Sequence, residues 1–245
     1  MSVRLKHLDT RAPEALDKEA TKIATQALLE KMRNQQKVLY AQKKYSLLVV
    51  LQGLDASGKD GVINNVFSGL NLLGCDVTAF KAPTETELSH DFLWRIHPHA
   101  PARGFIRLFN RSHYEDVLVP RVEQWIDQPT LHHRFNHINH FEQLLRDHDT
   151  LILKFYLHIS REKQLERLNE RLENPEKHWK HDEKDFAVRD RWDEYVAAYE
   201  DLFEQCGPDQ PWHLIPADQK WYKEHLIAKV VTEALDQLDL RYPDR

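Results

Sequence analysis

The sequence has few cysteines, no long apolar run and no surplus of positive charge. Its two cysteines, Cys75 and Cys206, lack the spacing of metal-binding motifs, so a cysteine-based zinc site is not expected. We recognise neither a signal peptide nor an apolar run long enough to span a bilayer, so we expect a cytoplasmic protein without a membrane partner. The formal net charge of -5 argues against bulk attraction to nucleic acid. A polyanionic ligand has to meet a local basic patch instead.

An apolar run that passes into a glycine-spaced loop is the most informative stretch. Residues 45–61 read YSLLVVLQGLDASGKDG. The spacing Gly53-x-x-x-x-Gly58-Lys59 matches the Walker A pattern, in which main-chain N–H groups surround phosphate oxygens and the lysine neutralises them. Such a turn can also be only a tight connection, but this one follows a predicted strand and precedes a predicted helix over 58–73, which favours phosphate binding. The loop residues expected to contact phosphate are Ala56, Ser57, Gly58, Asp60 and Gly61.

The residue after Lys59 departs from the Walker A pattern. The pattern has Ser or Thr there, whose hydroxyl holds magnesium, whereas this chain has Asp60. A second carboxylate, Asp55, lies inside the loop. Carboxylate oxygens are ligands that magnesium prefers, so both side chains are candidates for a magnesium site.

Alternation of strand-like and helix-like segments predicts an α/β fold. A long amphipathic helix is expected over 16–43, followed by strands at 46–52, 76–80, 105–109, 151–158 and 212–215. Helical patterns between the strands indicate a parallel sheet covered by helices on both faces. The polar segment 174–185 is interpreted as a mobile loop. We divide the chain into an N-terminal helical extension, 1–44, and a domain that carries the Walker loop, 45–245.

A second group of polar residues lies in FIRLFNRSHYEDV, residues 105–117. Asn110 follows a predicted strand, Arg111 comes next, and Glu115 and Asp116 fall in the first turn of a helix. In an open parallel sheet, ligands bind at the carboxyl ends of the strands. Arg111 and Glu115 could instead form a surface ion pair, and acidic residues suit the start of any helix. The neighbouring Walker loop favours the functional interpretation.

A basic stripe is predicted on the helix over 161–173. Its members are Lys163, Arg167 and Arg171, and Leu165, Leu168 and Leu172 are expected to face the core. Like charges four residues apart repel by roughly 0.2–0.5 kcal/mol per pair, which an anionic ligand would relieve. Four glutamates on the same helix could also offset the stripe, and the pattern alone favours that solvated face.

Several of these strings together resemble the family-2 polyphosphate kinases. They are GLDASGKDG, FKAPTETELSHDFLWRIHPHAPARG, FNRSHYEDVLVPRV, LKFYLHIS, RLENPEKHWK and DEYVAAYEDL. The resemblance runs from about Lys37 to the end of the sequence. FNRS followed by YE is similar to the single-domain group that phosphorylates AMP as well as ADP. The group restricted to nucleoside diphosphates usually carries Asp where this chain has Asn110.

The resemblance implies a fold and a reaction. The expected fold is a three-layer α/β/α P-loop kinase with a five-stranded parallel sheet and a helical lid at about 161–185. The expected reaction is magnesium-dependent transfer of the terminal phosphoryl group of inorganic polyphosphate to AMP and ADP, giving ADP and ATP, with Mn²⁺ as an alternative metal. The family is typically a homodimer or homotetramer.

The resemblance and the loop chemistry together assign a role to each candidate residue. The catalytic candidates are Asp55, Lys59, Arg111 and Asp116. Because Asn110 replaces a carboxylate, the metal ligands are expected to be Asp55 first, then Asp60 and Asp116. Beyond the loop, the phosphate or polyphosphate contacts are expected to be Arg121, Arg167, Arg171, Lys177 and Lys180. The nucleotide contacts are expected to be Lys81, Asn110 and Glu115.

Two other classes of function stay open at this point. An ATP-dependent kinase of a small metabolite or nucleotide would use the same loop but would not explain the basic residues from Lys163 to Lys180. A non-catalytic nucleotide-binding module would not explain the acidic residues Asp55, Asp60 and Asp116. The N-terminal helix could pack on its own domain or join subunits.

Overall fold

Runs rich in Val, Leu and Ile form one parallel sheet. In the computed structural model, which describes residues 3–244, its strands are β1 (Ser46–Gln52), β2 (Cys75–Ala79), β3 (Ile106–Asn110), β4 (Thr150–His158) and β5 (Trp212–Pro216). The strand order is β2-β3-β1-β4-β5 and every neighbouring pair is parallel. The five predicted strands are therefore confirmed, and each observed end lies within one residue of its predicted position.

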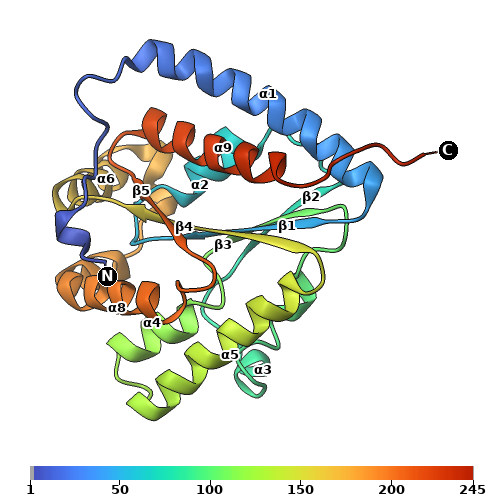
Figure 1. Cartoon of the computed structure of the whole chain (residues 1–245). Helices are drawn as coiled ribbons and strands as arrows, with labels where there is room; N and C mark the ends of the chain where they lie inside the picture. The colour runs from blue at the N-terminus through green and yellow to red at the C-terminus, as the bar shows by residue number, and fades with distance from the viewer. Residues whose placement is uncertain (1–2, 245) are drawn as a thin grey trace.

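Helices connect the strands and surround the sheet (Figure 1). The α-helices are α1 (Lys18–Gln42), α2 (Lys59–Val62), α3 (Glu85–Leu88), α4 (Glu115–Val122), α5 (Gln128–Arg146), α6 (Arg161–Glu173), α7 (Lys184–Asp190), α8 (Trp192–Gln205) and α9 (Lys220–Asp236). Short 3-10 helices are η1 (Leu5–His7), η3 (His97–His99) and η4 (Pro175–Lys180), and η2 (Ile63–Phe67) is a π-helix. Across residues 3–244, no helix combines the length and apolar character needed to cross a membrane.

Two apolar cores lie on opposite faces of the sheet. Leu47, Val49 and Leu51 pack with α1, η2 and α9, while Leu48 and Val50 pack with α4, α5 and α8. Successive side chains of a strand point to opposite faces, so a continuous apolar run such as β1 serves both cores. Figure 1 shows the same layers, with α1 and α9 above the sheet and α4, α5 and α8 below it. The predicted three-layer α/β/α architecture is confirmed.

The N-terminal helix packs on its own chain. Asp17 caps α1 by accepting a hydrogen bond from the Ala20 N–H. Along the helix, Lys31 pairs with Asp236, and the Gln35 amide donates to the Thr232 carbonyl at 3.0 Å. These contacts join α1 to α9, which is the first of the two arrangements considered for this helix (Figure 1).

The helix predicted over 58–73 is shorter than expected. Helical structure continues from α2 through η2 and ends at Phe67. The chain then turns, and the Gln36 side chain both donates to the Asn71 carbonyl and accepts from the Asn71 N–H, at 2.8 Å each. A tertiary contact from α1 therefore satisfies the main chain where the sequence pattern suggested further helix.

The polar segment 174–185, interpreted as a loop, contains helical structure. Asn174 caps η4 by accepting from the Glu176 N–H at 3.0 Å, and Pro175 occupies the first turn, where its missing N–H is tolerated. The segment ends inside the first turn of α7. The prediction failed because it gave the polar composition of the segment more weight than these capping signals.

A buried polar group, which we call the Glu142 cluster, lies against the sheet and consists of His113, Tyr114, Glu142 and Lys154. The Lys154 ammonium donates to Glu142 at 2.7 Å and to the Tyr114 hydroxyl at 2.9 Å, and it also donates to the Cys206 carbonyl. Tyr114 donates to Glu142 at 2.6 Å. Burial alone would raise the pKa of Glu142, but the hydrogen bond to His113 and the charge of Lys154 outweigh it and hold the pKa below its ordinary value. The carboxylate therefore stays ionised inside the core.

Candidate active site

The phosphate loop, residues 53–59, connects β1 to α2 by a tight turn. Gly53 and Gly58 have φ angles of 145° and 98°, a region that favours glycine. A Cβ on Gly53 would lie 2.9 Å from the Leu157 carbonyl oxygen of β4. Both glycines of the Walker A spacing are therefore required by the main-chain path.

The carbonyl groups of the phosphate loop point into the protein. The Lys59 ammonium donates to the Gly53 carbonyl at 2.7 Å. The Gln164 amide donates to the main-chain carbonyl of Asp55 at 3.0 Å, and the Arg167 guanidinium donates to the Ala56 carbonyl at 2.8 Å. The Leu54 carbonyl accepts from the Ser57 N–H. The Ser57 carbonyl accepts from both Arg167 and Lys223. The Gly58 carbonyl accepts from Lys223 and from the Val62 N–H. Within residues 3–244, no protein group accepts from the N–H of Ala56, Gly58 or Lys59. An anion can therefore be bound by free N–H groups, as in other phosphate loops.

Three cations contact this loop through its carbonyls, and we call Lys59, Arg167 and Lys223 the loop cations. Among residues 3–244, none of them forms an ion pair with a carboxylate. Lys59 is 8% exposed, and burial, with the neighbouring charge of Arg111, lowers its pKa. Hydrogen bonds to neutral carbonyls leave the positive charge uncancelled. The loop thus presents positive charge that a phosphate could neutralise.

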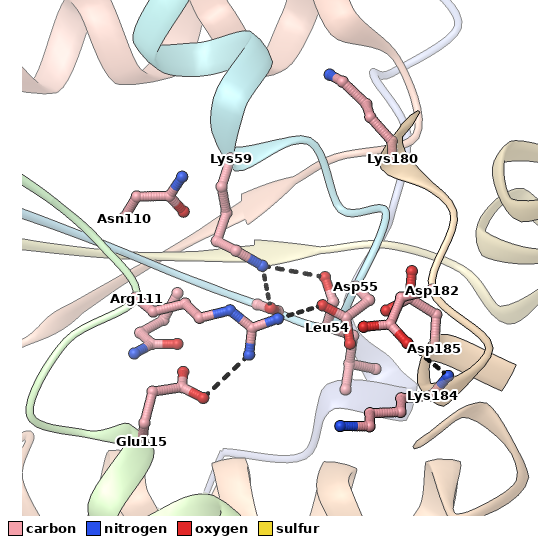
Figure 2. A network of polar contacts seen from close by, with 12 residues as sticks. Leu54, Asp55, Lys59, Asn110, Arg111, Glu115, Lys180, Asp182, Lys184 and Asp185 are labelled. Atoms are coloured by element: carbon pink, nitrogen blue, oxygen red, sulfur yellow. Dashed lines mark hydrogen bonds and ion pairs between the residues drawn. The ribbon is translucent and has the colours of Figure 1, made fainter. Parts of the chain in front are cut away.

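Arg111 joins the phosphate loop to the end of β3. Its guanidinium pairs with Asp55 of the loop and, at 3.1 Å, with Glu115 in the first turn of α4 (Figure 2). The charge of Glu115, with that of Asp55, raises the pKa of Arg111, so it stays charged. Residues about 56 positions apart are thereby in contact. The Arg111–Glu115 ion pair weighed as an alternative exists, and it lies beside the predicted site.

Asp60, which follows Lys59, also contacts the end of β3. Its carboxylate accepts from the Asn110 amide at 2.8 Å and lies 3.7 Å from the Lys180 ammonium of η4. Asp60 is exposed, so its oxygens are open to a further ligand.

Asp116 is separated from the other acidic candidates. It is largely buried and pairs with Arg95 at 3.1 Å. Burial raises the pKa of Asp116, and the charge of Arg95 opposes that rise. Within residues 3–244, no three His, Cys, Asp or Glu side chains are grouped as a metal site. The structure therefore does not gather Asp55, Asp60 and Asp116 into one protein-only cage.

The basic residues of α6 and η4 that were predicted to contact polyphosphate have protein partners. Arg171 of α6 donates to the Lys180 carbonyl at 3.0 Å and pairs with Asp185 of α7. Lys177 of η4 pairs with Glu170. The Arg167 guanidinium, besides its loop contacts, donates to the carbonyls of Ala217 and Asp218, both at 2.9 Å.

The predicted apolar face of α6 is only partly correct. Leu168 is buried, but Leu165 and Leu172 are 37% and 48% exposed. The spacing of these leucines matched a helix stripe, yet only its middle position meets the core.

Two remaining candidates lie outside the loop contacts. Arg121 of α4 pairs with Asp201 of α8. Lys81 follows β2, its side chain is exposed, and its carbonyl accepts from Arg95 at 2.8 Å. Neither side chain contacts the phosphate loop.

Sequence reasoning missed three residues that shape this site. Lys223 and Gln164 belong to no recognised motif, and Arg95 lies within the family-like string FKAPTETELSHDFLWRIHPHAPARG but was not singled out. Lys223 does precede Ile227 and Val231 at helical spacing on α9, so a lysine in register with an apolar stripe was an available signal. Gln164 gave no comparable signal.

Comparison with known proteins adds the following. The family model described as Polyphosphate kinase 2 (PPK2) matches residues 15–243. A Meiothermus ruber protein named AMP/ADP-polyphosphate phosphotransferase is 45% identical over 96% of this chain and 88% of its own length. A Rhodopseudomonas palustris ADP-polyphosphate phosphotransferase is 41% identical, over 88% and 79%. The crystal structure of Polyphosphate Kinase 2 from Arthrobacter aurescens TC1 superposes with a TM-score of 0.96 at 38% identity, covering 99% of this chain and 88% of that one.

Proposed function

We propose, on the premise that this chain belongs to the polyphosphate kinase 2 family, that it transfers the terminal phosphoryl group of inorganic polyphosphate to AMP and then to ADP. The products are ADP and ATP. The names of the Meiothermus ruber and Rhodopseudomonas palustris relatives support these substrates. The observation that carries the chemistry is the phosphate loop. Its carbonyls accept from protein donors, whereas the N–H groups of Ala56, Gly58 and Lys59 have no acceptor within residues 3–244.

Phosphoryl transfer needs alignment and positive charge more than covalent chemistry from the protein. Lys59 and the loop N–H groups hold the transferring phosphates, and Lys59 exchanges the Gly53 carbonyl for a phosphate oxygen. Arg111 stabilises charge on the transferred oxygens from the β3 side. Its two carboxylate partners fix the direction of the guanidinium, which reduces the reorganisation needed during reaction.

Asp55 and Asp60 fit the donor chemistry of magnesium, and Mn²⁺ suits the same oxygens. Magnesium usually takes one or two carboxylates together with substrate phosphates and water, so a protein-only cage is not needed. Asp55 is the principal ligand in this proposal and Asp60 the second. Asp116 is the weakest candidate, because it is separated from the loop carboxylates and is largely buried against Arg95. When bound, the metal supplies positive charge to the phosphate oxygens.

The segment α6–η4, with the start of α7, is proposed to act as a lid over about residues 161–185. The Lys180 ammonium lies 3.7 Å from Asp60. Figure 2 shows Asp185 beside Asp55. Arg171, Lys177 and Lys180 would contact the polyphosphate when the lid closes. Asn110, Glu115 and Lys81 are the proposed nucleotide contacts. We also propose that the protein acts in the cytoplasm and forms a homodimer or homotetramer. Light scattering measures this oligomeric state.

One assay tests this function. The protein is incubated with magnesium and inorganic polyphosphate, with AMP or ADP offered separately and no nucleoside triphosphate added, and the nucleotides are resolved by chromatography. We expect ADP and ATP from AMP, and ATP from ADP. Phosphorylation with ATP but not with polyphosphate would assign the protein to ATP-dependent kinases, and nucleotide binding without turnover would make it a binding module.

A further inference from the structure

The main-chain orientation of the phosphate loop depends on two helices outside it. All six carbonyls from Gly53 to Gly58 accept hydrogen bonds, and those of residues 55–58 accept them from side chains of α6 and α9. A peptide unit whose carbonyl points into the protein turns the N–H of the next residue in the opposite direction. Donors behind the loop therefore decide whether its N–H groups face a phosphate.

Lys223 of α9 is the more deeply buried of the two cations among the α6 and α9 donors. It is 1% exposed, and its ammonium donates to the Ser57 carbonyl at 3.0 Å and to the Gly58 carbonyl at 3.2 Å. A Cβ on residue 58 would lie 2.3 Å from the same nitrogen. The ammonium therefore occupies space that exists because residue 58 is glycine, so loop and helix fit one another as a unit.

We propose that Lys223 is a positioning residue for phosphoryl transfer, which holds the carbonyls of Ser57 and Gly58 turned into the protein and thereby keeps the loop N–H groups directed at the phosphates. The proposal rests on the function proposed above and deepens it. Lys223 contacts no reacting atom. Its effect passes through the loop, assisted by Arg167, which shares the Ser57 carbonyl.

The charges around Lys223 argue against a role in stability alone. Arg167 from α6, Lys59 from α2 and Lys220 from α9 face it with the same sign, and Glu224 from α9 is the opposing charge. Burial, followed by the charge of Arg167, lowers the pKa of Lys223 to about 7. Burial that disfavours the charged form of a basic group destabilises the folded protein at pH values below the ordinary pKa of that group, because the unfolded chain carries the charge there. Replacing it with an apolar side chain of similar length should not weaken the fold.

The two carbonyls also retain other partners if Lys223 is removed. Ser57 still accepts from Arg167 at 3.1 Å, and Gly58 still accepts from the Val62 N–H at 3.2 Å. Both carbonyls keep a donor, so loss of Lys223 should change the direction of the loop N–H groups more than the stability of the fold.

The test compares Lys223→Met with Lys229→Met. Lys229 lies on the same helix, is half-exposed and pairs only loosely with Glu233, at 3.8 Å, so it serves as the control. Steady-state rates with polyphosphate and AMP give kcat and the KM for AMP, and thermal unfolding gives Tm. Lys223→Leu, which also removes the donor, is measured in parallel and decides by the same criteria if the Met variant does not fold.

We expect Lys223→Met to lower kcat about tenfold or more, because small misplacements of catalytic groups are costly. The KM for AMP should stay within about twofold, and Tm should equal or exceed that of the control. A kcat within about twofold of the control, or a loss of rate that accompanies a lower Tm, would overturn the proposal. Absence of polyphosphate-dependent turnover in the wild-type protein would instead contradict the proposed function.

Discussion

The loop cations and the Glu142 cluster both contain buried charged groups, but their charges are balanced in different ways. Lys154 donates to a carboxylate, a hydroxyl and a carbonyl, so its positive charge meets a negative one inside the core. Lys59 donates to the carbonyls of Gly53 and Leu54, which carry no net charge. The first lysine has a complete set of protein partners, whereas the second retains the capacity to bind an anion.

The comparison separates two uses of a buried lysine. Removing one partner of a buried ion pair leaves an uncompensated charge and is strongly destabilising. Removing a cation held only by carbonyls relieves a desolvation cost but deletes charge from the site. The first change should therefore be detected as lost stability and the second as lost activity.

Lys154→Met should give the largest effect on stability. It leaves the Glu142 carboxylate buried without its cation, so we expect a loss of about 3–5 kcal/mol in the free energy of unfolding. Urea denaturation measures it, with Lys22→Met as the control, because Lys22 forms an exposed pair with Glu19 worth about 0–1 kcal/mol. Equal stability of the two variants would show that the Glu142 cluster is not the closed ion pair described here.

Lys59→Met should have the opposite signature. Turnover with polyphosphate and AMP should fall by about 10²–10³-fold, as when one preorganised charge is removed from other enzymes, while the free energy of unfolding stays equal or rises. Steady-state rates and urea denaturation of the same preparation test both parts. Near-normal turnover would contradict the role of Lys59, and a parallel loss of stability would place it in the same class as Lys154.

Asp55→Asn and Asp116→Asn extend the contrast to carboxylates. A neutral amide is a weak ligand for a hard cation, so Asp55→Asn should raise the magnesium concentration needed for half-maximal rate by about tenfold or more. Asp116→Asn should affect stability instead, because Asp116 pairs with buried Arg95. Magnesium titrations and unfolding curves are measured for both. A larger magnesium effect for Asp116→Asn would reverse our choice of ligand.

The smallest expected effect concerns Asp185 in the proposed lid. Burial, followed by the charge of Asp55, raises the pKa of Asp185 to about 6 from 3.8. Between these values the folded protein holds a proton that the unfolded chain has lost, so stability from this group falls as pH rises from about 4 to 6. Asp185→Asn should flatten the pH dependence of Tm across that window. An unchanged slope would mean that the carboxyl is not perturbed.

The strands and the phosphate loop were predictable because their signals are local. A run such as SLLVVLQ is apolar enough to serve both cores, and the Walker spacing directly follows it. The juxtaposition of Arg111 with the loop was also predictable, since both lie at carboxyl ends of neighbouring strands.

Apart from the segment 174–185, whose capping signals are local, the errors and omissions share a physical cause. The contacts of Gln36 with Asn71, of Arg95 with Asp116 and of Lys223 with Ser57 join residues about 20 to 170 positions apart. Periodicity reports which side of a helix is apolar but not which distant group meets it. Leu165 and Leu172 match the stripe of α6 and remain exposed for that reason, because only Leu168 faces a packed neighbour.

Calorimetric titration of inorganic polyphosphate tests most directly whether the loop cations remain free to bind an anion. Wild type, Lys59→Met and the Lys229→Met control are titrated at two salt concentrations. We predict that wild type and control bind equally and weaken together with added salt, since a polyanion held by several cations releases counterions on binding. Lys59→Met should bind about tenfold more weakly or worse. Equal affinity of Lys59→Met and wild type at both salt concentrations would contradict the account.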